Sequence, residues 1–209
     1  MLITRRSTLA LVGATMLAPA ARAAGAAPSP YTQRSIGSPN APVTAIEYFS
    51  LTCTHCAHFA NVTMPQVKPN LVDTGKLQII YHDFPLDQVA LMAAQVARYL
   101  PPEQYYPFIE ALFASQDNWA FVPVTDTNHP PDYAALLYQY AALAGMDQTT
   151  YNTALADTKL RDFILQGQQE AETLYHVNAT PTFIINGKTY PGAMEYDDFA
   201  SVVAQAAKG

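Results

Sequence analysis

The sequence is poor in charged residues, in cysteine and in clustered basic residues, and each shortage argues against a class of protein. Only 13% of the 209 residues are charged while half are apolar, which excludes an intrinsically disordered chain, since such chains combine few apolar residues with high net charge. The net charge is −6 and Lys and Arg form no cluster, which argues against a nucleic-acid-binding surface. Two cysteines cannot hold a small disulfide-rich fold together, so we expect them to serve local chemistry.

The N-terminal residues also lack an apolar run long enough to cross a membrane. Residues 1–23 carry Arg5 and Arg6, then a short apolar run, then a small-residue cleavage pattern around Arg22, and they predict a signal peptide. A membrane span needs about 20 consecutive apolar residues, roughly twice this run. Export by the Sec or the twin-arginine route predicts a periplasmic protein, in a compartment where disulfides persist. Residues 24–41, rich in Ala, Gly, Pro and Ser, are expected to form a flexible lead-in.

Two segments with the composition of strands flank the cysteines. Residues 43–51 and 77–84 are rich in β-branched and aromatic residues and predict buried strands. The segment between them has helical spacing, with Pro65 and Pro69 predicted to kink or break the helix. A strand, helix and strand joined by a crossover of about 25 residues predict parallel strands in a right-handed βαβ unit.

The remainder predicts an α/β fold interrupted by helices. Residues 87–176 carry four apolar stripes at helical spacing, the last of which includes Phe163 and Leu174, and they predict an inserted all-helical subdomain. Asn186-Gly187 suits a two-residue type I′ turn, so residues 182–190 predict a β-hairpin, and a final amphipathic helix follows. The α/β core is therefore expected in two pieces, residues 42–86 and 177–209.

The strongest local signal is the pair Cys53 and Cys56 at the junction between a strand and a helix. Cysteines three residues apart on a first helical turn lie on one face, so their sulfurs can reach disulfide distance. Cys53 lies where unpaired N–H groups and the helix dipole favour a thiolate, so we expect its pKa to fall. A lower pKa stabilises the dithiol relative to the disulfide and makes the pair more oxidising. His55 can add a hydrogen bond or positive charge to this thiolate, and Cys56 is expected to be the less accessible resolving partner.

Other uses of the two cysteines are less favoured. A purely structural disulfide across so small a loop would constrain the unfolded chain little. Zinc is a second alternative, because His55 and His58 lie beside the cysteines, but a structural zinc usually takes four ligands and there is no second cysteine pair. A c-type haem needs His directly after the second cysteine, where this chain has Ala57. We therefore expect no metal and no cofactor.

The second signal is Thr180-Pro181, directly before the predicted hairpin. Most X-Pro bonds in folded proteins are trans. The order of elements here resembles a thioredoxin fold, however, and that resemblance implies that a proline at the start of this strand forms a cis-proline loop against the cysteines. The free backbone of Thr180 could then pair with an extended substrate segment.

The stretches APVTAIEYFSLTCTHC and VNATPTFIINGK together resemble the DsbA family of exported thiol-disulfide oxidoreductases, and the resemblance covers about residues 42–207. It implies a thioredoxin-like fold with an inserted helical subdomain between its two halves. Two positions depart from the family pattern: Thr54 replaces a common proline, and Thr180 replaces the valine often found before the cis-proline. Both positions tune redox poise, so they leave the strength of the oxidase open.

The resemblance also implies a role for each site residue. Cys53 would be the nucleophile and Cys56 the resolving thiol, with His55 tuning them and Thr180-Pro181 forming the cis-proline loop. Glu47 matches a buried acidic position that serves proton transfer, although a solvated strand residue is an equally simple interpretation of its place in the sequence.

The resulting hypothesis is a monomeric periplasmic oxidase that donates its disulfide to reduced or misoxidised exported proteins and is reoxidised by a DsbB-like membrane partner. A reductase or isomerase of the same fold is the first alternative. A non-catalytic protein-binding module with structural cysteines is the second, and it predicts an unreactive Cys53.

Overall fold

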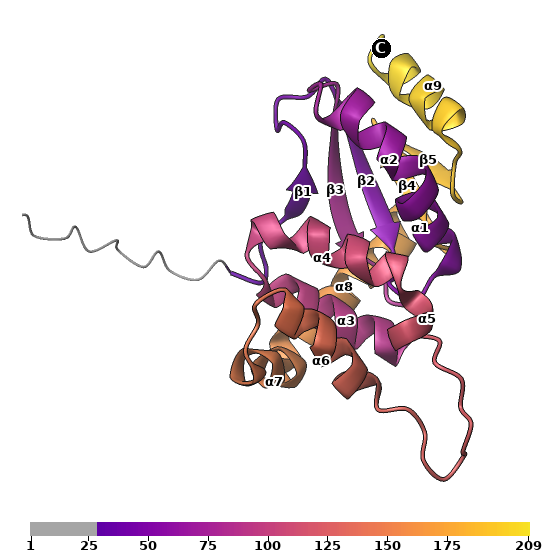
Figure 1. The fold of residues 1–209 in the computed structure, drawn as a ribbon. Helices are drawn as coiled ribbons and strands as arrows, with labels where there is room; N and C mark the ends of the chain where they lie inside the picture. The colour runs from indigo at the N-terminus through magenta and orange to yellow at the C-terminus, as the bar shows by residue number, and fades with distance from the viewer. Residues whose placement is uncertain (1–28) are drawn as a thin grey trace, which may run out of the picture.

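A five-stranded sheet forms the centre of the molecule (Figure 1). The computed structural model describes residues 29–209. The predicted signal peptide and residues 24–28 of the predicted lead-in therefore lie outside the described residues. The strands lie in the order β1-β3-β2-β4-β5. Their bounds are β1 Arg34–Ile36, β2 Val43–Phe49, β3 Leu77–Asp83, β4 Thr182–Ile185 and β5 Lys188–Pro191.

The βαβ unit predicted around the cysteines is confirmed. Strands β2 and β3 pair in parallel, with Val43 opposite Leu77 and Phe49 opposite Asp83. The crossover is a continuous helical path made of α1 (Thr54–His58), η1 (Phe59–Thr63), α2 (Met64–Val67) and η2 (Lys68–Val72).

The predicted kink takes the form of two π-helical segments rather than a break. The N–H groups of Met64 and Asp73 bond five residues back, to the carbonyls of Phe59 and Lys68. Pro65 and Pro69 lack the N–H of the normal ladder, and each ring clashes with the carbonyl four residues earlier, so the helix widens around them.

The segment between β3 and β4 is helical, as predicted, and Figure 1 shows it gathered near the carboxyl ends of β2 and β3. Its apolar stripes lie in α3, α4, α6 and α8, whereas α5 and α7 were not predicted. Helix α7 shows no stripe because only Tyr151 and Ala154 are buried along it. The helices are α3 Gln88–Tyr99, α4 Pro102–Ala114, α5 Gln116–Trp119, α6 Tyr133–Leu143, α7 Gln148–Ala156 and α8 Thr158–Tyr175.

The predicted stripe of α8 is wrong at two positions. Leu174 is 67% exposed and Phe163 is 40% exposed, whereas Leu160, Ile164 and Ala171 are buried. Helix α8 contacts α3 and β3 along that narrower face. Phe163 and Leu174 therefore lie outside the face of α8 that packs on the core.

The prediction that the chain stays flexible up to residue 41 is wrong, because residues 34–36 form β1 at the edge of the sheet. This strand pairs antiparallel with β3, with Arg34 opposite Tyr81. Three residues are too few to show a strand pattern in the sequence. The strand is held instead by contacts with residues far away in the sequence. The local composition, rich in Ala, Gly, Pro and Ser, does not reveal such contacts.

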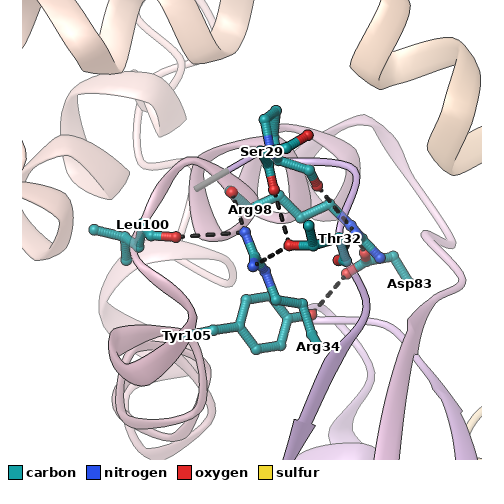
Figure 2. Close-up of polar contacts among 8 residues, drawn as sticks. Ser29, Thr32, Arg34, Asp83, Arg98, Leu100 and Tyr105 are labelled. Atoms are coloured by element: carbon teal, nitrogen blue, oxygen red, sulfur yellow. Dashed lines mark hydrogen bonds and ion pairs between the residues drawn. The ribbon is translucent and has the colours of Figure 1, made fainter. Parts of the chain in front are cut away.

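A buried cluster of charges fixes β1 to the rest of the fold (Figure 2). Arg34 is 1% exposed and donates from Nη2 to the carbonyl of Arg98 at 2.5 Å and to that of Leu100 at 3.4 Å. The Nε of Arg98 donates to Oδ2 of Asp83 at 2.5 Å, and the Tyr105 hydroxyl donates to Oδ1 of Asp83 at 3.3 Å. Strands β1 and β3 and helices α3 and α4 thus share one polar network in which Arg98 pairs with Asp83 and Arg34 donates to backbone carbonyls.

The C-terminal half follows the prediction closely. Strands β4 and β5 form an antiparallel hairpin whose turn residues Asn186 and Gly187 have φ of 46° and 79°, as a type I′ turn requires. Helix α9 (Tyr196–Ala206) ends the fold and buries Phe199. The Phe199 ring lies 5.3 Å from the ring of Phe59 and 5.4 Å from that of Phe183, centroid to centroid. This aromatic cluster joins the crossover helix to β4 and α9.

No helix within residues 29–209 combines the length and the apolar character needed to cross a membrane.

Candidate active site

Cys53 lies at the N-cap of α1, four residues after the end of β2. Its backbone is extended (φ −86°, ψ 121°), and its Sγ accepts a hydrogen bond from the N–H of Cys56 at 3.4 Å. Cys53 is 7% exposed and Cys56 is fully buried, and both are free thiols. The loop after β2 therefore leaves Cys53 slightly exposed and Cys56 wholly buried.

This environment strongly favours the thiolate form of Cys53. A hydrogen bond from the Cys56 side chain is the largest cause that lowers the pKa of Cys53, from 9.0 to about 5. Burial opposes this shift, while Thr180 and the backbone N–H groups of Cys56 and His55 add to it. Hydrogen bonds to the charged form stabilise that form, as expected for a thiolate at a helix N-terminus.

Cys56 has the opposite behaviour. Burial raises its pKa well above 9.0, and the neighbouring Cys53 sulfur raises it further, with a smaller contribution from Glu47. In the reduced protein the pair therefore holds one thiolate, on Cys53, and one thiol, on Cys56. Such an asymmetric pair has a clear nucleophile and a clear resolving group.

The predicted proline loop lies directly against Cys53. The Thr180–Pro181 bond is cis, and the Cys53 thiol donates to the Thr180 carbonyl at 3.2 Å. On the other side of the loop, the N–H of Gly192 donates to the Pro181 carbonyl at 2.7 Å. Residues 127 positions apart in the sequence thus meet at one point.

His55 and His58 both lie on the exposed side of α1. The part of His55 that contributes to the lowered pKa of Cys53 is its backbone N–H. His58 pairs instead with Glu195, Nε2 to Oε1, at 3.0 Å. Within residues 29–209 no group of three His, Cys, Asp or Glu side chains gathers as a metal site.

Glu47 is buried beneath the cysteines, so the interpretation of a solvated strand residue is wrong. It is 3% exposed on β2, between Tyr81 on β3 and Phe183 on β4. Burial is the main cause that raises its pKa from 4.5 to about 8, and the charge of Cys53 raises it further. Glu47, Tyr81 and the exposed Glu110 line a small cavity of about 10 Å³, close to the size of one water molecule.

The sequence analysis missed polar residues that hold the loop before Cys53. Thr52 donates its hydroxyl to Oδ2 of Asp87 at 2.7 Å, which ties the loop to the N-cap of α3. Gln116 in α5 donates from Nε2 to the carbonyls of Leu51 at 2.8 Å and Cys53 at 3.1 Å. A single amide or hydroxyl far away in the sequence carries no motif, so no local signal could have identified these residues.

Comparisons with known proteins agree with this geometry. A family model described as thioredoxin matches residues 29–205. The crystal structure of alpha-DsbA1 from Wolbachia pipientis is 31% identical, with a TM-score of 0.74 over 84% of this chain and 91% of that one. BdbD from Bacillus subtilis is 21% identical and shares the fold, with a TM-score of 0.71 over 85% and 94% of the two chains.

Among curated proteins, a chain of Rickettsia felis whose name assigns it to the protein-disulfide oxidoreductases is 26% identical over 172 residues. The match covers 82% of this chain and spans 59% of that relative. The family model extends across both halves of the sheet and the helices between them, and a solved DsbA structure exceeds 30% identity over most of both chains. The protein therefore belongs to the DsbA family of thioredoxin-fold proteins.

Proposed function

We propose that this protein is a periplasmic thiol-disulfide oxidase that transfers the Cys53-Cys56 disulfide to reduced exported proteins. The observation that carries the proposal is the position of the Cys53 sulfur. This sulfur accepts the N–H of Cys56 and lies 3.2 Å from the carbonyl of Thr180 in the cis-proline loop, and Cys53 is 7% exposed whereas Cys56 is fully buried. A sulfur that the N–H groups at the start of α1 stabilise as a thiolate is a good leaving group, and its disulfide is a strong oxidant.

The reaction has two exchange steps. In the first, a substrate thiolate attacks Cys53 of the disulfide, the bond between Cys53 and Cys56 breaks, and Cys56 receives the electron pair. In the second, another substrate thiolate attacks the substrate sulfur of the mixed disulfide and releases Cys53 as a thiolate. The substrate gains one disulfide, and the protein is left with one thiolate and one thiol.

The cis-proline loop supports the binding of an extended substrate. Thr180 lies beside Cys53 with its carbonyl toward that sulfur, so a substrate chain pairing with this backbone would bring its own cysteine to the site. When Cys53 is protonated, below its pKa of about 5, the same carbonyl accepts the hydrogen bond of its thiol. We propose that Thr180-Pro181 aligns the incoming thiolate. We also propose that His55, on the exposed side of α1, tunes the redox poise of the cysteine pair.

Glu47 supplies the proton that Cys56 needs. The Cys56 thiolate formed in the first step is buried, and its pKa lies well above 9.0, so it must be protonated at once. With a pKa of about 8, Glu47 is mostly protonated near neutral pH and can donate. The cavity shared with Glu110 gives Glu47 a route to recover a proton from solvent.

A Glu47→Gln variant is expected to slow reduction of the Cys53-Cys56 disulfide by a dithiol peptide, by about tenfold or more, because a general acid is removed. Rapid mixing with fluorescence or quench detection measures this rate. Glu195→Gln is the matched control, since Glu195 is an exposed carboxylate that pairs with His58 of α1, and the rate of this variant should equal that of the unchanged protein. An unchanged rate in Glu47→Gln would remove the proton-donor role.

The overall proposal is tested by equilibrating the protein in a series of glutathione buffers and counting free thiols after acid quench. We expect the pair to remain reduced well into oxidising buffer, because the Cys53 thiolate stabilises the dithiol state. A pair that stays oxidised in reducing buffer would instead indicate a reductase or a structural disulfide.

Turnover requires an oxidant that restores the disulfide. We propose a DsbB-like membrane partner for this step and a monomeric oxidase as its substrate. Light scattering that gives the mass of a dimer would contradict the monomer. If Cys53 and Cys56 stay reduced in cells that possess a DsbB-like protein, that protein is not the partner that reoxidises them.

A further inference from the structure

Gln116 is a buried amide that the helical insert places against the loop leading to Cys53. It is 8% exposed and begins α5, which Figure 1 shows close to the start of α1. Its Nε2 donates to two carbonyls at once, that of Leu51 at 2.8 Å and that of Cys53 at 3.1 Å. One side chain from the insert thus bonds the chain on both sides of Thr52.

The short helix that carries Gln116 is itself firmly held. The Gln116 carbonyl accepts the N–H groups of Ala120 at 2.8 Å and Phe121 at 3.0 Å. Trp119 is fully buried, and its indole N–H donates to the Leu112 carbonyl at 2.9 Å. Because its backbone is fixed in this way, the Gln116 side chain reaches the loop from a rigid base.

The two hydrogen bonds from Gln116 hold the peptide groups after Leu51 and Cys53, and the orientation of these groups sets the position of the Cys53 sulfur. The Cys53 carbonyl also accepts the N–H of Ala57 at 3.1 Å, the first bond of α1. Gln116 therefore holds the N-cap residue in the orientation in which the Cys56 N–H reaches Sγ. Its amide N–H groups also oppose the negative ends of two carbonyl oxygens in the loop that carries the thiolate, those of Leu51 and Cys53.

We propose that Gln116 is a positioning residue that sets the redox poise of the Cys53-Cys56 pair from within the helical insert. The insert then acts on the chemistry through a defined contact, although no cysteine lies in it. This inference rests on the proposed function, since it concerns the same thiol pair. Gln116 acts on the Cys53 sulfur through the loop backbone, whereas the N–H of Cys56 bonds Sγ directly.

The chain offers a matched control in Gln95 of α3. Gln95 is 3% exposed, and its Nε2 also donates to two carbonyls, those of Ala154 at 2.9 Å and Asp157 at 3.1 Å. Both of its acceptors lie within the helical insert rather than in the active-site loop. Replacing either glutamine by the similarly shaped and flexible methionine removes two buried amide bonds, so the two variants share any general loss of stability.

The test compares Gln116→Met, Gln95→Met and the unchanged full-length mature protein in two measurements. The first is the pH titration of the Cys53 thiolate by ultraviolet absorbance, and the second is the glutathione equilibrium. For Gln116→Met we expect a higher pKa of Cys53 and an equilibrium shifted toward the disulfide by about three- to tenfold, the effect of one or two lost hydrogen bonds. For Gln95→Met we expect both values to match the unchanged protein.

Equal thiolate titrations in all three proteins would overturn the inference and leave Gln116 a structural residue. Should Gln116→Met not fold, Gln116→Asn takes its place, because it shortens the side chain by one methylene and withdraws the amide from the two carbonyls. We expect Gln116→Asn to shift the pKa of Cys53 and the glutathione equilibrium in the same directions. Unchanged values in Gln116→Asn would equally overturn the inference. The unchanged protein is measured in the same buffers. If its own pair is a stable disulfide, the proposed oxidase function fails, whatever Gln116 does.

Discussion

Cys53→Ser is expected to abolish disulfide transfer to a reduced peptide, with a loss of at least about a thousandfold. The hydroxyl cannot form the mixed disulfide through which every exchange step passes. Cys56 is an ineffective replacement, because it is fully buried and its pKa lies well above 9.0. Fluorescence of a dithiol peptide that closes on oxidation measures the rate, and circular dichroism confirms that the variant folds.

Cys56→Ser is the matched control, and its expected result is different. Cys53 remains a thiolate, so it still forms mixed disulfides, but no resolving thiol is present to release them. The variant should therefore accumulate a covalent complex with a cysteine-containing peptide presented as an activated disulfide, visible as a mass increase. Transfer at the normal rate by Cys53→Ser would reject the proposed nucleophile. Absence of any complex with Cys56→Ser would show that Cys53 is unreactive, as the alternative of a protein-binding module predicts.

The parts of the fold that could be predicted from the sequence are those with strong local signals. Strand β3 is centred on apolar and aromatic residues, Ile79, Ile80 and Tyr81, and the turn at Asn186 and Gly187 uses residues that accept positive φ. The cysteine pair and Thr180-Pro181 could be identified for the same reason, since each is a short motif next to a strand. Their meeting at 3.2 Å was expected only through the order of the strands and the family resemblance.

The parts that could not be predicted depend on contacts between distant residues. Strand β1 has three residues and is held by Arg34, which donates to the carbonyls of Arg98 and Leu100, 64 and 66 positions away. Glu47 lies on β2, which has β3 on one side and β4 on the other. Such a central strand is covered on both faces and shows little alternation, so its sequence pattern does not separate a buried carboxyl from an exposed one. Gln116 reaches the site by a path that no spacing rule describes.

The ratio of reduced to oxidised protein at fixed glutathione is expected to rise with pH from about 5 to about 8, by up to about tenfold per pH unit, and to level off above that range as the glutathione thiols ionise at about pH 8.5. The cause is the Cys53 thiol, whose pKa falls from 9.0 to about 5 in the folded protein. Above pH 5 the reduced protein carries a thiolate there, so reduction by glutathione releases one proton and is favoured as pH rises. Below pH 5 the thiol is protonated, no net proton is released, and the ratio becomes constant.

Glu47 titrates in the same range, but it is present in both redox states, so most of its effect cancels from the ratio. The part that remains comes from the charge of Cys53, which raises the pKa of Glu47 only in the reduced state. The reduced protein therefore holds slightly more proton near pH 8, and the rise should flatten at its upper end. Compared with the unchanged protein, Glu47→Gln should rise more steeply just below about pH 8 and keep the break near pH 5, whereas the levelling caused by glutathione ionisation is common to both proteins. The comparison therefore separates the two groups within one experiment. A ratio that stays constant from pH 5 to pH 8 would mean that Cys53 is an ordinary thiol, and the oxidising character proposed for the pair would then have no physical source.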